Sequence, residues 1–76
     1  MVTAFVMIVS TPGGEKELAQ DLRRLSEVKE VWEVYGEYDL VVRVQINSLQ
    51  LLDSFVRDRI RRMPAVRLTT TMISVD

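Results

Sequence analysis

The sequence predicts a small α+β domain whose elements follow one another in the order β-α-β-β-α-β. Stretches with an apolar residue at every second position alternate with stretches where apolar residues recur every three or four positions. Glycine and proline separate these stretches, at "TPGG", at Gly36 and at Pro64. A chain of 76 residues is also short enough for one domain, and we expect residues 1–76 to form it.

The first two predicted elements are a strand at residues 2–10 and a helix after it. The strand "VTAFVMIVS" is rich in β-branched and aromatic residues and stops at "TPGG". Thr11 followed by Pro12 predicts a helix N-cap with proline at the first helical position. Three leucines then recur at spacings of four and three, as on one face of a helix: Leu18, Leu22 and Leu25.

Residues 30–46 predict a β-hairpin. The stretch "EVWEVY", residues 30–35, is typical of a strand, and Gly36 suits a turn because glycine tolerates positive φ. In "LVVRVQI", residues 40–46, the side chains alternate between two faces, which predicts the second arm. Trp32 is expected in the core because large aromatics mainly supply buried area, and contact with another dimer at the sheet edge is the alternative.

A second helix is predicted over residues 47–63, where Asn47 and Gln50 are spaced like a capping box. Its apolar stripe consists of Leu52, Phe55, Val56, Ile60 and Met63. Two acid–base pairs four residues apart support it: Asp53 with Arg57, and Asp58 with Arg62. Pro64 ends the helix, and "AVRLTTTMISV", residues 65–75, predicts the last strand.

Six elements in this order predict a ferredoxin-like βαββαβ plait. The four strands would form an antiparallel sheet in the order 4-1-3-2, with right-handed crossovers that place two helices on one face. The opposite face of the sheet would then have no cover within the chain.

The first strand is apolar on both faces, which predicts an association surface. Ala4, Val6 and Ile8 point to one face, so the intervening apolar residues point to the face that the helices leave open. An open apolar sheet face is unusual for a monomer. We therefore expect a homodimer that packs sheet face on sheet face through Phe5, Met7, Val9, Val41, Ile73 and Val75.

Two polar stretches are candidate ligand contacts. Gly36, Tyr38 and Asp39 can be explained as a plain hairpin turn, although a turn does not require Tyr38, and the carboxylate of Asp39 suits an ammonium group. Three threonine hydroxyls suit a carboxylate, and edge-strand propensity explains them equally well: Thr69, Thr70 and Thr71. The two stretches belong to opposite sheet edges, about 14 Å apart. A small ligand touching both would therefore lie between subunits.

Composition excludes several classes of function. Ten basic and eleven acidic residues give a net charge of −1, which does not attract nucleic acid. Cysteine and histidine are absent from the sequence, so we expect no metal site, no cofactor, no catalytic residue and no enzymatic activity. The apolar run "AFVMIV" is too short to span a bilayer, and no charged segment precedes it; we expect a cytoplasmic protein without membrane contact.

The order and spacing of several motifs resemble the RAM domain (regulation of amino acid metabolism) of the Lrp/AsnC transcriptional regulators. These motifs are "AFVMIV", "PGG", "EVWEVYGEYDLVVRV" and "MPAVRLTTTMI", and they cover nearly the whole chain. The most specific part is Val34, Gly36, Tyr38 and Asp39 followed by Pro64, Val66, Thr69 and Thr71. The likeness is to the stand-alone form of the domain, because no helix-turn-helix segment precedes residue 1, and direct DNA binding is not expected.

This resemblance implies an assembly and a ligand. It implies dimers that pack sheet on sheet, an octamer or similar ring of dimers, and small amino acid effectors bound between dimers. Gly36, Tyr38 and Asp39 would belong to the effector loop, and a neighbouring subunit would contribute Thr69, Thr70 and Thr71. Full-length Lrp/AsnC regulators would be partners through mixed assembly.

Three other classes of protein are considered. The ACT domain is another amino-acid-binding plait and predicts ligand contacts around Pro12 to Glu15 instead. An enzyme on a dimeric α+β barrel would have to use Tyr38 and Asp39 as an acid–base pair, with no visible partner. RNA recognition needs aromatics on the first and third strands, where only Phe5 is available. The arginines of residues 57–62 occupy two helix flanks, which favours a solvated face or contacts between dimers.

Overall fold

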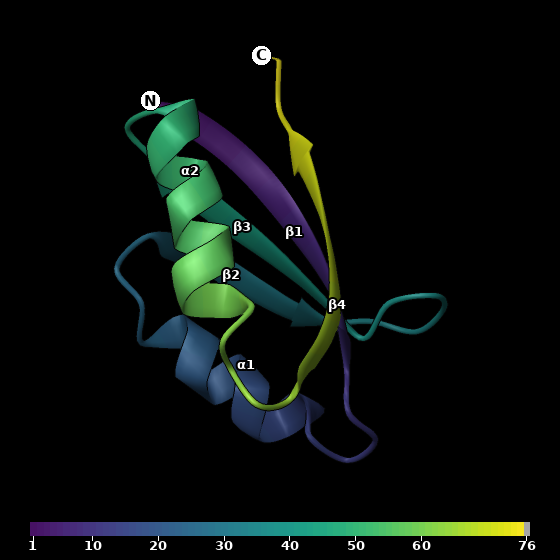
Figure 1. Cartoon of the computed structure of the whole chain (residues 1–76). Helices are drawn as coiled ribbons and strands as arrows, with labels where there is room; N and C mark the ends of the chain where they lie inside the picture. The colour runs from purple at the N-terminus through teal and green to yellow at the C-terminus, as the bar shows by residue number, and fades with distance from the viewer. Residues whose placement is uncertain (76) are drawn as a thin grey trace.

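The computed structural model describes residues 1–75 as a four-stranded antiparallel sheet with two helices on one face (Figure 1). The elements are β1 (Val2–Ser10), α1 (Glu15–Arg23), β2 (Val28–Glu33), β3 (Leu40–Ile46), α2 (Leu49–Phe55) and β4 (Val66–Ile73). A π-helical segment, η1 (Val56–Ile60), continues α2. The strand order is β2-β3-β1-β4. The predicted ferredoxin-like fold with strand order 4-1-3-2 is therefore confirmed.

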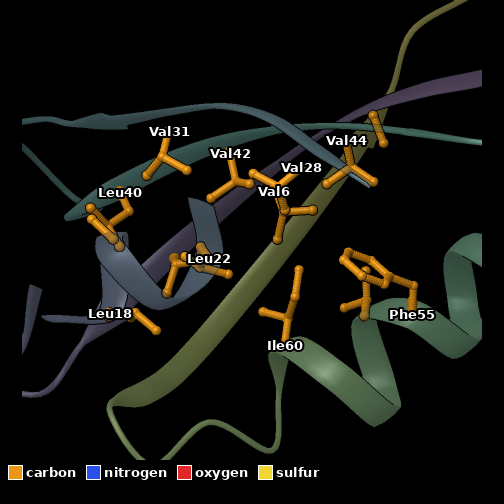
Figure 2. Close-up of a cluster of buried hydrophobic side chains, with 14 of the residues drawn as sticks. Val6, Leu18, Leu22, Val28, Val31, Leu40, Val42, Val44, Phe55 and Ile60 are labelled. Carbon is orange, nitrogen blue, oxygen red and sulfur yellow. The ribbon is translucent and has the colours of Figure 1, made fainter. Parts of the chain in front are cut away.

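The core lies between the sheet and the helices (Figure 2). Ala4, Val6 and Ile8 of β1 are fully buried, which confirms the alternation predicted for that strand. Burial of each large aliphatic side chain contributes about 1.5–3 kcal/mol to folding. The other elements close the core with Leu18, Leu22, Val31, Leu40, Val42, Val44, Leu52, Phe55 and Ile60.

Helix α1 begins at Glu15, so the predicted N-cap at Thr11 is wrong. Pro12 and Gly13 belong to a turn in which the Gly14 N–H donates to the Thr11 carbonyl at 3.0 Å. Gly13 has a φ of 80°, a conformation that favours glycine. Gly14 is the N-cap, and a Cβ there would lie 2.7 Å from Thr11 Oγ1. The "PGG" motif is therefore a tight turn between β1 and α1.

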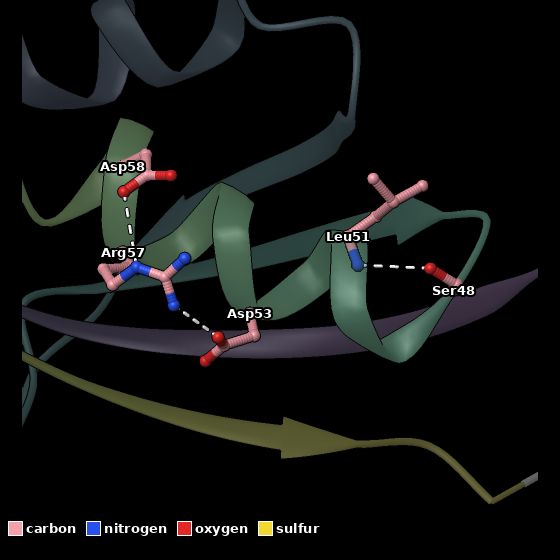
Figure 3. A network of polar contacts seen from close by, with 5 residues as sticks. All are labelled: Ser48, Leu51, Asp53, Arg57 and Asp58. Atoms are coloured by element: carbon pink, nitrogen blue, oxygen red, sulfur yellow. Dashed lines mark hydrogen bonds and ion pairs between the residues drawn. The ribbon is translucent and has the colours of Figure 1, made fainter.

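Helix α2 is capped by Ser48, one residue after the predicted Asn47. Ser48 is extended, and its side chain accepts a hydrogen bond from the Leu51 N–H at 3.1 Å (Figure 3). This contact satisfies one of the unpaired N–H groups at the start of the helix. The helix widens in η1, where the Arg61 N–H donates to the Val56 carbonyl at 2.8 Å.

Arg57 lies between two carboxylates of the second helix (Figure 3). It pairs with Asp53, as predicted, and with Asp58 at 3.4 Å. The hydrogen bond to Asp53 and the charge of Asp58 raise the pKa of Arg57. The predicted pair of Asp58 with Arg62 does not occur within residues 1–75. The wider π turn changes the spacing on which an i,i+4 pair depends.

The register of β4 corrects two predicted members of the open sheet face. Directly opposed residues of antiparallel strands share a face. Ile73 lies opposite Ala4, so it shares the side of the sheet on which the helices pack. Val75 lies beyond the end of β4 and is 97% exposed. The prediction that Ile73 extends the open face is therefore wrong, and Val75 lies outside the strand that was expected to place it there.

All four strands nevertheless contribute apolar side chains to the open face. Met72 and Leu68 lie opposite Phe5 and Val9 of β1 and take the place expected for Ile73. The apolar members of this open sheet face are Phe5, Met7, Val9, Trp32, Val41, Leu68 and Met72, and the same face also contains Thr70 and the ion pair of Arg43 with Glu30.

Trp32 belongs to this open face, so the prediction that it packs in the core is wrong. It lies opposite Val41 and is 42% exposed. The neighbouring Val31 lies opposite Val42 and occupies the core position, with 8% exposure. The alternation of side chains along β2 therefore directs the large ring away from the helices.

Candidate effector-binding site

The loop of residues 34–39 joins β2 to β3 and extends from the sheet on the side away from the helices (Figure 1). The Val34 N–H donates to the Asp39 carbonyl at 2.9 Å and closes the base of the loop. Gly36 has a φ of 123°, which confirms that its position requires a backbone conformation suited to glycine. The turn explanation therefore accounts for Gly36.

Asp39 connects this loop to the end of β1 through hydrogen bonds. Its backbone N–H donates to the Ile8 carbonyl at 2.8 Å, and its Oδ2 accepts from the Ser10 N–H at 2.8 Å. Ser10 is only 5% exposed, so this carboxylate satisfies a buried N–H group. The other oxygen of Asp39, Oδ1, has no hydrogen bond within residues 1–75. One oxygen thus positions the loop, and the other can accept a bond from a ligand.

Tyr38 connects the loop to β4 within the same chain. Its hydroxyl donates to Thr70 Oγ1 at 3.2 Å. Because β1 lies between β3 and β4, the Tyr38 side chain crosses β1 on the open face to make this contact. Met7, opposite Thr70, is only 9% exposed.

This contact shows that the two candidate stretches meet inside one chain, contrary to the expectation that only an intersubunit site could join them. The estimate of about 14 Å measured from one edge strand to the other. Tyr38 starts from a loop at the end of the sheet, and its long side chain covers part of that distance.

Thr69 and Thr71 lie on the opposite side of the sheet from Thr70. They are paired with Ile8 and Val6, whose side chains face the helices. Both threonines line a hollow of about 280 Å³ between α2 and β4. The other lining residues are Leu49, Leu52, Asp53, Val56 and Arg61. The three threonines therefore do not act as one group of hydroxyls.

Asp39 also lines a hollow that is rich in negative charge. This hollow has a volume of about 330 Å³ and is lined by Glu15, Glu33, Val34, Tyr35 and Asp39. Three carboxylates around one space favour a cationic group such as an ammonium. Sequence reasoning missed Glu33 and connected Glu15 only with the ACT alternative, because only the fold brings the start of α1 beside the loop. Among residues 1–75, no group of three side chains is arranged to hold a metal ion.

The fold is that of a small ferredoxin-like domain with an open sheet face rich in apolar side chains and a polar loop beside it. The chain belongs to the Lrp/AsnC family: the family model of the Lrp/AsnC ligand binding domain matches residues 3–76. This match decides in favour of the Lrp/AsnC family over the ACT alternative.

Three relatives illustrate the likeness. The HTH-type transcriptional regulator FL11 of Pyrococcus abyssi is 39% identical over 70 residues, which are 92% of this chain and 46% of the regulator. The crystal structure of FFRP-DM1 is 47% identical with a TM-score of 0.96, covering 99% of this chain and 100% of that chain. A feast or famine regulatory protein from M. tuberculosis, complexed with L-methionine, is 28% identical with a TM-score of 0.86, covering 100% of this chain and 51% of that chain.

The chain spans about half the length of the curated regulators it matches. The chain therefore corresponds to the ligand-binding domain of the family and not to a whole regulator. Within residues 1–75, none of the helices is long and apolar enough to cross a membrane.

Proposed function

We propose that this protein is an amino-acid-binding and oligomerisation module of transcriptional regulation, without enzymatic activity and located in the cytoplasm. The observation that carries the proposal is the contact between Tyr38 and Thr70, which joins the hairpin loop to β4 at the open sheet face. The L-methionine bound to the M. tuberculosis relative supports an amino acid as the ligand.

The open sheet face supplies the dimer contact in this proposal. Two copies pack through Phe5, Met7, Val9 and Val41, with Met72 in the position first assigned to Ile73. Burial of this apolar surface in a partner removes it from water, at roughly 25 cal/mol for each Å² buried. Dimers then assemble into an octamer or a similar ring, and full-length Lrp/AsnC regulators join through the same surfaces.

The effector lies between dimers and contacts both candidate stretches. The ammonium group lies near Asp39 Oδ1, where Glu15 and Glu33 add negative charge. The carboxylate accepts a hydrogen bond from the Thr70 hydroxyl, and Gly36 allows the loop backbone to come close to the ligand. The proposed contact residues are Gly36, Tyr38, Asp39 and Thr70; Thr69 and Thr71 were also predicted as contacts, but they lie on the other side of the sheet and are not included.

Native mass spectrometry of the protein, alone and with each common amino acid, tests this proposal because it reports assembly and occupancy together. We expect a ring of dimers that binds about one amino acid per subunit. Tyr38→Phe removes one hydroxyl and should weaken binding about 3- to 10-fold, the usual effect of losing one neutral hydrogen bond. Thr3→Val removes a hydroxyl from β1 that forms no side-chain hydrogen bond in residues 1–75, and it serves as the matched control.

A ring that binds no amino acid would contradict the effector role and leave the assembly role intact. A monomer would contradict both. Unchanged affinity in both Tyr38→Phe and Asp39→Ala would contradict the location of the site. Asp39→Ala also loses the contact with the Ser10 N–H, so its folding must be checked by circular dichroism.

A further inference from the structure

Another hollow, which the effector proposal does not use, lies where the end of η1 meets the start of β4. It has a volume of about 240 Å³ and is lined by Arg61, Val66, Arg67, Leu68 and Thr69. Two arginines and one threonine belong to this lining, and no acidic residue does. The lining residues therefore carry two positive charges and no negative one, in a protein whose net charge is −1.

These arginines differ from the others because their side chains have no partner among residues 1–75. Five arginines form an ion pair, a hydrogen bond or an aromatic contact: Arg23, Arg24, Arg43, Arg57 and Arg59. Within residues 1–75, no ion pair or hydrogen bond involves the side chains of Arg61, Arg62 and Arg67. Two of these three arginines line the same small hollow.

Two irregularities of the backbone bring these arginines to the hollow. Arg61 directly follows the π turn of η1. Arg67 is the extra residue of a β-bulge, because Val9 pairs with Leu68 while Ser10 pairs with Val66. Both π turns and β-bulges redirect side chains and are frequent at functional sites. Either arginine would take another direction on a regular helix or strand.

We propose that this hollow binds a small tetrahedral oxyanion of the phosphate class. Like charges that share a hollow repel each other, and an anion between them removes that repulsion. Guanidinium groups bind phosphate oxygens with two parallel hydrogen bonds, and the Thr69 hydroxyl adds another donor. A phosphate has the charge and the number of oxygens to engage both arginines, whereas a carboxylate has one charge and two oxygens.

Isothermal titration calorimetry with potassium phosphate, in chloride buffer of constant ionic strength, tests the inference. Arg67→Gln and Arg61→Gln should each weaken phosphate binding about tenfold or more, as expected for the loss of a charged hydrogen bond. Arg62→Gln removes the same charge from an adjacent arginine outside the hollow and should change affinity less than about twofold. Equal losses in all three variants would reduce the effect to general electrostatics and overturn the proposal.

Further titrations identify the source of the phosphate. Tighter binding of a phosphorylated sugar than of free phosphate would support a metabolite as the ligand, and equal binding would support the free anion. Acetate that binds as well as phosphate would overturn the proposal. The proposal would also be overturned if Arg61→Gln and Arg67→Gln changed the mass of the assembly and left phosphate affinity unchanged. In that case the arginines would contact another copy of the chain.

The inference does not rest on the proposed effector function. Arg67 lines the proposed oxyanion hollow and not the hollow between α2 and β4, which Arg61 and Thr69 also line. Arg67→Gln should therefore lose phosphate binding and keep its amino acid affinity. Amide shifts of residues 66–69 on phosphate addition, measured by two-dimensional NMR, should locate the anion.

Discussion

The two faces of the sheet contain similar apolar side chains, but only one face finds its cover within the chain. On β1, Val6 and Ile8 are fully buried under the helices, while Phe5 and Val9, between and beside them, remain partly exposed. The strand alternation that produces both faces is a local property. Whether a face is buried depends on what packs against it, and we propose that a second copy of the chain covers the open face.

The largest expected effect lies on the covered face. Ile8→Ala leaves a cavity in a core with 0% exposure at that position and should lower the free energy of unfolding by about 2–5 kcal/mol. Val9→Ala on the open face should cost clearly less in the monomer. Urea denaturation of both variants at low protein concentration measures the difference. Equal losses would mean that the two faces do not differ in the way described.

Substitutions on the open face should weaken dimerisation and leave the folding of the monomer unchanged. Val41→Asp places a charge in the middle of this face, beside Met7 and Trp32, and should weaken dimerisation at least about tenfold because an unpaired charge is costly to bury. Analytical ultracentrifugation measures the dissociation constant. Gln20→Asp adds the same charge on α1, away from the sheet, and should leave the dimer unchanged. A Val41→Asp protein that dimerises like the natural sequence would refute the predicted interface.

The smallest expected change in stability concerns helix α2, which helps to cover the buried face of the sheet. Ser48→Ala removes the N-cap contact with the Leu51 N–H and should lower the free energy of unfolding by about 1 kcal/mol. Asn47→Ala, one residue earlier, should cost less, because Ser48 and not Asn47 caps the helix. Thermal unfolding monitored by circular dichroism compares the two variants. A larger loss for Asn47→Ala would contradict the observed cap.

The candidate site was predictable only in part. The need for glycine at position 36 follows from the turn and was confirmed by its positive φ. The contact of Tyr38 with Thr70 was not predictable, since these residues are 32 positions apart and meet only after β1 and β4 pair. The proposed oxyanion hollow was not predictable either. Its arginines lie beside a π turn and in a β-bulge, and no local sequence pattern predicted these two irregularities.

The sequence by itself determined the order of the elements, the fold and the two apolar faces of β1, because hydrophobic period and turn residues are properties of neighbouring positions. The tertiary structure decided which side chains of β4 belong to the open face of the sheet. Pairing Met72 with Phe5 and Ile73 with Ala4 set that side, and a shift of one residue would have reversed every side chain of the strand. Register depends on hydrogen bonds between strands far apart in the chain, such as those of residues 4–10 with residues 66–73. For that reason, only the folded chain shows which residues are available to a partner or a ligand.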